Sequence, residues 1–171
     1  MIVFDASTLI LLAKAELLES FLMQSTLAAL VPREVAREAC EEKSSFDALL
    51  IRRLIADKQP AEKQIAVESL RQRTLFNKLR LDLALGVGEA EAIALAVARS
   101  AQLVATDDKR AIDACKLVRM PFTSAIPILV RMYEKGAIDQ QSALLKLGIL
   151  ERAGRYRKSI VGAARTRLEE D

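Results

Sequence analysis

The sequence predicts an α/β fold of three layers, in which a central parallel sheet of about four to five strands is flanked by helices. Short apolar runs that are typical of buried strands alternate with longer stretches of helical periodicity. This alternation indicates parallel strands joined by helices. The composition agrees, because 51% of the 171 residues are hydrophobic and only 4% are aromatic. We therefore expect a core of aliphatic side chains packed between helices and sheet.

The N-terminal part of the chain supplies the first three strands and the helices between them. Strands are expected at residues 2–4, 28–31 and 65–67. Helices are expected at residues 8–24, 33–42, 46–57 and 70–83. Pro32 suits the first position of the helix that follows it, because its φ angle is already close to the helical value.

The C-terminal part continues the alternation and then becomes entirely helical. Strands are expected at residues 103–105 and 118–122. Helices are expected at residues 89–99, 108–115, 125–135, 140–150 and 156–169. The helix at 89–99 is apolar nearly all round, which predicts that it is buried. The length suits one domain over residues 1–171, with a core at 1–135 and a C-terminal helical extension at 136–171.

The composition also excludes several classes of chemistry. The chain has no histidine, which rules out imidazole catalysis, Ser-His-Asp triads and His-ligated zinc. Its two cysteines, Cys40 and Cys115, are far apart and are expected to be free thiols. No secretory signal is visible, and the longest strictly apolar run, 92–98, is far short of the ~20 residues that span a bilayer. A cytoplasmic protein without a membrane anchor is expected.

Basic side chains are concentrated near the C-terminus. The whole chain has a net charge of +3, whereas residues 152–168 contain six basic residues and no acidic one. Such a segment fits the phosphate backbone of RNA, although a solvated helix face would show the same pattern. The candidate RNA-binding residues are Arg152, Arg155, Arg157, Lys158, Arg165 and Arg167.

Acidic residues follow two of the predicted strands directly. Asp5 comes after the first strand, and Asp107 and Asp108 come after the strand at 103–105. Because the carboxyl ends of parallel strands meet at one edge of a sheet, these carboxylates are expected at the same edge. Taken singly, Asp5 or Asp107 could instead cap the N-terminus of the next helix.

Glutamates occupy two further places where a carboxylate is unexpected. Glu38 lies one turn beyond Glu34 in VPREVAREAC, and Glu89 and Glu91 open the apolar helix in GVGEAEAIALA. Clustered carboxylates repel one another and stay ionised only when a cation joins them. Oxygen ligands without histidine or cysteine favour Mg²⁺ or Mn²⁺. Such a site suits cleavage of phosphodiester bonds by a metal-activated water.

These motifs, in this order, resemble those of the PIN-domain (PilT N-terminus) family, the nuclease fold of VapC-type toxins. The matching pieces are VFDASTLI, VPREVARE, GEAEAIALA and VATDD, which span about residues 2–108. The stretch that follows, through 127–129, resembles a subgroup with a Gly-Glu-Ala-Glu motif. Each piece alone is weak, but four in the family's order are specific.

The resemblance implies a catalytic, metal-binding quartet of acidic residues. Its members would be Asp5, Glu38, Glu89 and Asp108, with Ser7 and Thr106 supporting them. Glu91 is the alternative to Glu89, and Asp107 is the alternative to Asp108. On an ideal helix Glu89 and Glu91 lie about 200° apart, so both cannot point into one site. Glutamate at the third position departs from the aspartate that is commoner in the family.

The resemblance further implies a Mg²⁺- or Mn²⁺-dependent endoribonuclease that leaves 5′-phosphate and 3′-hydroxyl ends. RNA would be the substrate. If the chain is the toxin of a toxin–antitoxin pair, a small antitoxin protein is the expected partner and a homodimer the expected assembly. The alternative function is a PIN-fold module that binds RNA or a partner protein with little or no nuclease activity.

Overall fold

The computed structural model describes residues 1–41, 44–56, 65–69, 71 and 73–170. Its centre is a five-stranded, all-parallel sheet in the order β3-β2-β1-β4-β5. This sheet confirms the predicted α/β class. The strands are β1 (Ile2–Phe4), β2 (Ala29–Pro32), β3 (Ile65–Glu68), β4 (Leu103–Ala105) and β5 (Phe122–Thr123).

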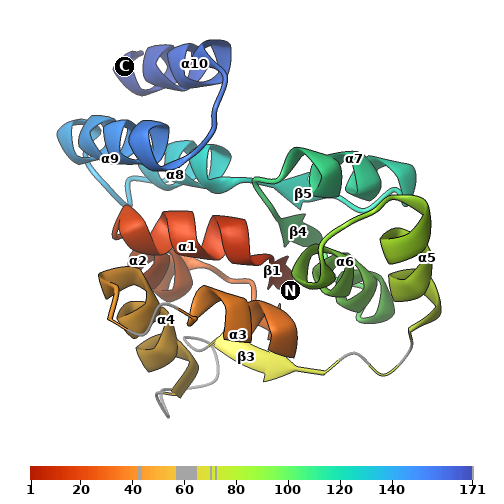
Figure 1. Ribbon diagram of the computed structural model, residues 1–171. Coiled ribbons are helices and arrows are strands. Elements are labelled where there is room, and N and C mark those ends of the chain that lie inside the picture. The colour runs from red at the N-terminus through yellow and green to blue at the C-terminus, as the bar shows by residue number, and fades with distance from the viewer. Residues whose placement is uncertain (42–43, 57–64, 70, 72, 171) are drawn as a thin grey trace.

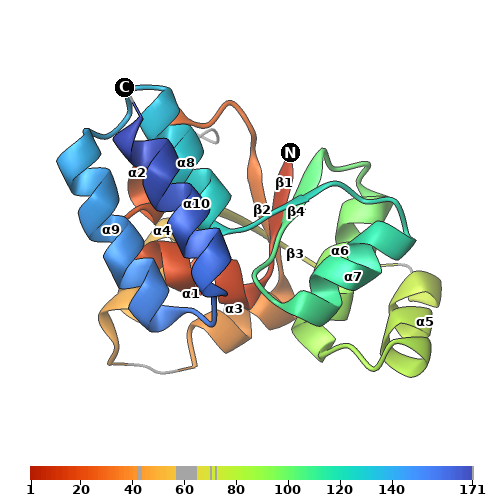
Figure 2. The ribbon, with the colours of Figure 1, turned by 90° about the horizontal axis from the view of Figure 1, so that it is seen from above.

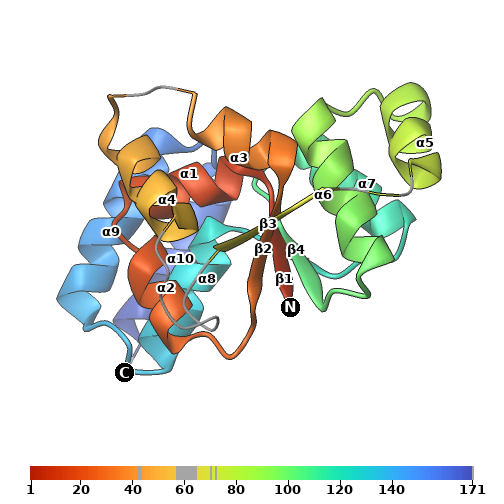
Figure 3. The ribbon, with the colours of Figure 1, turned by 90° about the horizontal axis from the view of Figure 1, so that it is seen from below.

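Helices cover both faces of the sheet (Figure 1). The first helices are α1 (Ala6–Lys14), α2 (Leu18–Gln24), α3 (Arg33–Ala39), α4 (Phe46–Ala56) and α5 (Thr74–Asp82). The later ones are α6 (Val87–Ala98), α7 (Lys109–Leu117), α8 (Ala125–Glu134), α9 (Gln140–Ala153) and α10 (Lys158–Glu169). Figure 3 shows the layers from below, with α5, α6 and α7 on one side of the strands and α1, α2, α4, α8, α9 and α10 on the other.

The helix expected at residues 8–24 is in fact two helices, α1 and α2. Glu16 adopts a left-handed backbone conformation with φ of 55° and closes α1. The change of direction after Glu16 lets the adjacent Leu17 and Leu18 both pack into the core, where each is fully buried. The demand for burial at these two positions explains why one continuous helix was the wrong prediction.

Other element boundaries also differ from the sequence predictions. Pro32 is the last residue of β2 and the N-cap of α3, so it stands just before the first helical position. The last strand contains only Phe122 and Thr123, because Arg119, with φ of 55°, still belongs to the turn that closes α7. Helix α5 begins at Thr74. Residues 42, 57, 70 and 72 of the predicted helices lie outside the described residues.

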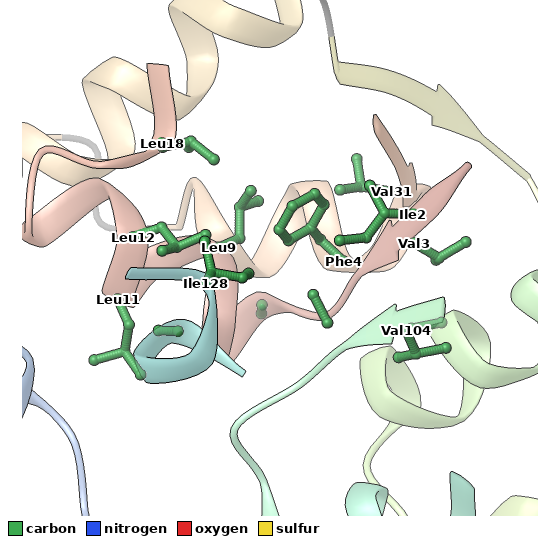
Figure 4. Packing of buried hydrophobic residues seen from close by; sticks show 14 of the residues in the cluster. Ile2, Val3, Phe4, Leu9, Leu11, Leu12, Leu18, Val31, Val104 and Ile128 are labelled. Carbon is green, nitrogen blue, oxygen red and sulfur yellow. The ribbon is translucent and has the colours of Figure 1, made fainter. Parts of the chain in front are cut away.

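The central strand β1 is enclosed on both faces. Its three residues are at most 1% exposed, and Ile2 and Phe4 point to the face that carries Leu9, whereas Val3 points toward Val104 (Figure 4). On the Val104 side, α6 contacts β1, β2 and β4, and four of its buried residues are alanines, Ala90, Ala92, Ala94 and Ala96. Small side chains allow a helix to approach a sheet closely. The residue that follows β1 is therefore held in a rigid setting.

The C-terminal helices pack on the body of the protein. Helix α9 contacts both α1 and α8, and α10 contacts α8 and α9. Buried Leu147 and Leu150 join the common core, and Lys146 Nζ donates a hydrogen bond of 2.8 Å to the carbonyl oxygen of Ala15. The division into a core at 1–135 and an extension at 136–171 stays a prediction. Across the described helices, none has both the length and the apolar character needed to cross a membrane.

Candidate active site at the carboxyl edge of the sheet

Asp5 stands at the carboxyl end of β1 and is only 3% exposed. One carboxylate oxygen, Oδ1, accepts a hydrogen bond of 2.5 Å from the backbone N–H of Ser7, so Asp5 caps α1. The other oxygen accepts a hydrogen bond from the hydroxyl of Thr106, which is fully buried at the end of β4. Both roles considered for Asp5, a cap and a member of an acidic site, are compatible with this position.

Burial raises the pKa of Asp5 to about 6. The hydrogen bonds from Thr106 and Ser7 lower the pKa and offset part of this effect, while the negative charge of Glu89 raises it further. A carboxyl that is desolvated and faces another carboxylate favours its neutral form unless a cation is nearby. Asp5 is therefore a group whose charge depends on what binds beside it.

Glu38 and Glu89 extend the acidic site from Asp5 toward the solvent. Glu89 is half-buried in the first turn of α6, and its carboxylate accepts a hydrogen bond of 2.8 Å from the backbone N–H of Gly86. Glu38 is exposed in the last turn of α3. Its pKa is raised mainly because neighbouring protein atoms partly desolvate the carboxylate, and also because of the negative charge of Glu89. Asp5, Glu89 and Glu38 thus form a series of interacting carboxylates that runs from the core to the surface.

Gly88 allows α3 and α6 to approach each other at this site. A Cβ atom on Gly88 would lie 2.7 Å from Oε2 of Glu38 and 3.4 Å from the side chain of Val35. Real Cβ atoms are not found so close to an oxygen, so any larger residue would displace the Glu38 carboxylate. Gly88 of the GVGEAEA motif thus leaves room for the Glu38 carboxylate at this position.

Glu91 is directed away from this series. It is 7% exposed, and its Oε2 accepts a hydrogen bond of 3.2 Å from the backbone N–H of Glu34 in the first turn of α3. The N-cap of that helix is Pro32, whose side chain cannot accept a hydrogen bond. Glu91 supplies the missing acceptor from another element. The structure therefore separates the two glutamates: Glu89 interacts with Asp5 and Glu38, and Glu91 stabilises α3.

Asp107 is the centre of a hydrogen-bond network between four segments. Its Oδ2 accepts hydrogen bonds from the hydroxyl of Thr8 at 2.6 Å and from the backbone N–H of Ala125 at 3.0 Å. Its Oδ1 accepts one from the hydroxyl of Tyr156 at 2.5 Å. Its own backbone N–H donates to the hydroxyl of Ser7 at 3.1 Å. The carboxylate thereby joins the ends of β4, α1 and α8 to the segment before α10.

Asp108, rather than Asp107, caps α7. Its Oδ1 accepts hydrogen bonds from the backbone N–H groups of Arg110 at 2.8 Å and Ala111 at 3.1 Å. Its backbone N–H donates to the Thr106 hydroxyl at 3.3 Å, and that hydroxyl in turn donates to Asp5. The predicted fourth acid is thus connected to Asp5 through Thr106, with one carboxylate oxygen engaged in the cap.

The donor set fits a hard divalent cation in its chemistry. All the acidic groups offer oxygen, and the like-charge interactions among Asp5, Glu89 and Glu38 are those that a bound cation would relieve. The groups are not drawn together into a tight cluster, since the described residues contain no set of three or more His, Cys, Asp or Glu side chains placed to hold a metal ion. The acidic residues therefore fit a divalent cation in the type of their donor atoms and in their charge.

The basic C-terminal residues fall into two groups. Arg165 lies 3.9 Å from Glu151, and Arg167 donates a hydrogen bond of 2.9 Å to Glu134. The other four are exposed and form no ion pair within the part of the chain that the structure describes: Arg152, Arg155, Arg157 and Lys158. The sequence pattern grouped all six residues in one candidate surface. In the structure, only the second group is without an ion-pair partner among the described residues.

Two residues of this region were missed by sequence reasoning, Thr8 and Tyr156. Thr8 stands three residues after Asp5, the N-cap of α1, and that spacing could have indicated a shared side. Tyr156 is 49 residues from Asp107 and has no local signal that predicts its hydrogen bond.

A family model described as a PIN domain matches residues 1–170. No curated protein and no solved structure matches the chain.

Proposed function

The chain belongs to the PIN-domain family, and from this premise we propose that it is a metal-dependent endoribonuclease. PIN domains are generally nucleases and typically use divalent metal ions. The observation that carries the proposal is the series of interacting carboxylates Asp5, Glu89 and Glu38, which starts in the core and reaches the surface at the carboxyl edge of a parallel sheet. This is the edge at which α/β proteins place their sites.

Four residues would hold Mg²⁺ or Mn²⁺ in this proposal: Asp5, Glu38, Glu89 and Asp108. Bound there, the ion supplies neutralisation of the charge that develops on the phosphate and activation of the attacking water. Both carboxylate oxygens of Asp5 are held in position, because Thr106 donates a hydrogen bond to one and Ser7 donates a hydrogen bond to the other. Glu38 is the most accessible member and has no hydrogen bond or ion pair among the described residues, which leaves its carboxylate free for a ligand.

The raised pKa of Asp5 gives the site a characteristic dependence on pH. A cation requires the ionised carboxylate, so its binding should release protons and strengthen as the pH rises through about 6. Thr106 contributes by donating its hydroxyl proton to Asp5, which favours the ionised form that a cation needs. The raised pKa of Asp5 and its hydrogen bond from Thr106 are present before any ligand binds.

Cleavage assays with the purified chain test the proposal. Single-stranded and structured RNA are incubated with Mg²⁺, Mn²⁺ or EDTA, beside Asp5→Asn and the control Asp113→Asn. Asp113 is an exposed residue of α7 that pairs with Lys116 at 3.2 Å. We expect cleavage only with the metal ion, a loss of about 100-fold or more in Asp5→Asn, and no loss in the control. Cleavage that survives both EDTA and Asp5→Asn would overturn the mechanism.

The same assay tests the alternative, a PIN-fold module that binds RNA or a partner protein without cutting it. The spread of the carboxylates among the described residues favours this alternative, since no ready-made group of three acids is present there. Its signature is retention of RNA by the wild type without cleavage in Mn²⁺, with the same affinity in Asp5→Asn. Weakening of retention by salt would then identify the binding as electrostatic.

A further inference from the structure

The linker between α9 and α10 is attached to the edge of the acidic site by one side chain, Tyr156. Its hydroxyl donates a 2.5 Å hydrogen bond to Oδ1 of Asp107. Burial and the negative charge of Asp107 raise the pKa of Tyr156 above its usual range, so the hydroxyl keeps its proton and remains a donor. The bond joins residues 49 positions apart and fixes the end of the linker.

Gly154 makes room for this arrangement. A Cβ atom there would overlap the ring of Tyr156 and would lie 3.0 Å from the carbonyl oxygen of Leu150. The φ angle of Gly154 is −99°, which any residue can adopt. Glycine at this position is therefore required by the closeness of the tyrosine ring, and replacement by alanine should push the ring away from Asp107 without altering either partner of the hydrogen bond.

The linker is only a few hydrogen bonds from Asp5. Asp107 accepts from Thr8 and donates through its backbone N–H to Ser7 Oγ, and the backbone N–H of Ser7 donates to Asp5. Figure 2 shows the linker beside the N-terminal end of α1, with the start of α7 on the other side. The position of the linker is thus defined relative to the acidic site.

Cations border the site on both sides of Asp107. Arg155 and Arg157 flank Tyr156 in the sequence, are exposed, and form no ion pair in the described part of the chain. Helix α7, which follows Asp107 and Asp108 in the sequence, begins with Lys109 and Arg110, which are exposed as well. Carboxylates at the centre repel a phosphate backbone, and basic groups around them are what allow a polyanion to approach.

We propose that the linker is a binding surface for a single-stranded polyanion, in which Tyr156 acts as a positioning residue that holds Arg155 and Arg157 at the border of the acidic site. The two guanidinium groups bind phosphates that flank the bond to be cut. The identity of the polyanion as an RNA substrate, and of these phosphates as the neighbours of the bond to be cut, rests on the proposed function.

Binding measurements in EDTA test the surface without cleavage. The probe is a fluorescein-labelled single-stranded RNA, titrated with the full chain at several salt concentrations. The variant Arg155→Gln/Arg157→Gln should weaken binding about 10-fold or more and reduce the salt slope by about 1.4, which is the value for two phosphate contacts on a single strand. The matched control is Arg165→Gln/Arg167→Gln, which removes two arginines that are already paired with Glu151 and Glu134 and should change the affinity less than about 2-fold.

The role of Tyr156 is tested by removing its hydroxyl alone. Tyr156→Phe should weaken RNA binding several-fold, and Gly154→Ala should do the same while Tyr156 and Asp107 stay intact. The control is Tyr133→Phe, the only other tyrosine of the chain. If the chain cleaves RNA, Tyr156→Phe should raise KM and leave kcat nearly unchanged, which a general loss of folded protein would not do. Equal affinities for Tyr156→Phe and Tyr133→Phe would overturn the positioning role.

The outcomes separate this inference from the proposed nuclease function. Metal-dependent cleavage with unchanged RNA binding in Arg155→Gln/Arg157→Gln would refute the binding surface and leave the nuclease intact. Weakened RNA binding by that variant, together with a wild type that cleaves no RNA, would support the binding surface and refute the nuclease. Both arginines are exposed, so the variant is expected to fold, and its thermal unfolding curve verifies this.

Discussion

Two groups of carboxylates share the carboxyl edge of the sheet, and they are satisfied in different ways. Asp107 and Glu91 accept hydrogen bonds from backbone N–H groups or hydroxyls of other segments, and Asp108 accepts them from two backbone N–H groups in the first turn of its own helix. Glu38 has no such partner among the described residues, and Glu38 and Asp5 each interact unfavourably with Glu89. The first group stabilises the fold. The second is placed where a cation would relieve its repulsion.

Acidic residues that are neighbours in the sequence need not share a role in this protein. Asp107 and Asp108 are adjacent, yet one joins four segments and the other caps a helix. Glu89 and Glu91 are two residues apart on one helix and point to different partners. Asp5 belongs partly to both groups, since it caps α1 and also faces Glu89. Substitutions that remove one carboxylate at a time can therefore test whether the two groups have different roles.

Asp107→Ala should give the largest loss of stability. Removal of the carboxylate leaves the hydroxyls of Thr8 and Tyr156 and the N–H of Ala125 without their acceptor. We expect a decrease of about 4 kcal/mol in the free energy of unfolding, measured by urea denaturation. Asp113→Ala, on the exposed face of α7, should cost less than about 0.5 kcal/mol. Equal effects of the two substitutions would contradict the structural role of Asp107.

Asp5→Asn should change how stability depends on pH, in the metal-free protein with EDTA present. The pKa of Asp5 is raised from 3.8 to about 6 in the folded state, so the folded protein binds the proton more tightly than the unfolded chain. The resulting stability is complete below about pH 4 and is lost as the pH rises through 6. Relative to the wild type, Asp5→Asn should gain about 2.5 kcal/mol between pH 4 and pH 7. Parallel stability curves for the two proteins would show that Asp5 is not desolvated.

Glu38→Gln should separate activity from stability. The side chain is exposed and lacks hydrogen-bond partners in the described structure, so the melting temperature should change little. If Glu38 holds the metal ion, the rate of Mn²⁺-dependent cleavage should fall about 100-fold, which corresponds to about 2.7 kcal/mol. Glu41→Gln is the matched control one turn later, where the carboxylate is 74% exposed and 3.9 Å from Arg37. A similar rate loss in both variants would remove Glu38 from the site.

Substitutions of Asp108 should show a modest effect on stability that depends on the cap. Asp108→Ala removes the N-cap of α7 and should cost about 1 kcal/mol, whereas Asp108→Asn should keep the cap within a few tenths of that value. Because asparagine preserves the cap and removes the charge, cleavage by Asp108→Asn reports on the cation alone. Full activity in Asp108→Asn would place Asp108 entirely in the group that stabilises the fold.

Much of the architecture follows from the sequence by local physical rules. Apolar runs of strand length alternating with helices dictated a parallel sheet, and the parallel sheet brought Asp5 and the Asp107-Asp108 pair to one edge. The helix at α6 was expected to be buried because it is apolar nearly all round, and it is. Periodicity is a property of short segments, and the parallel direction of the strands follows from their alternation with helices, so both can be inferred from the sequence.

The tertiary structure decided which carboxylate does what. Glu91 rather than Glu89 completes α3, because Pro32 leaves that helix without a cap. Asp108 rather than Asp107 caps α7, and Tyr156 reaches Asp107 across 49 residues. The roles of Glu91 and Asp107 depend on donors contributed by distant segments, whereas the cap at Asp108 uses N–H groups of its own helix. The free energy of a buried hydrogen bond between distant segments exists only once both partners have been brought together and removed from water. No pattern within a single segment contains that information.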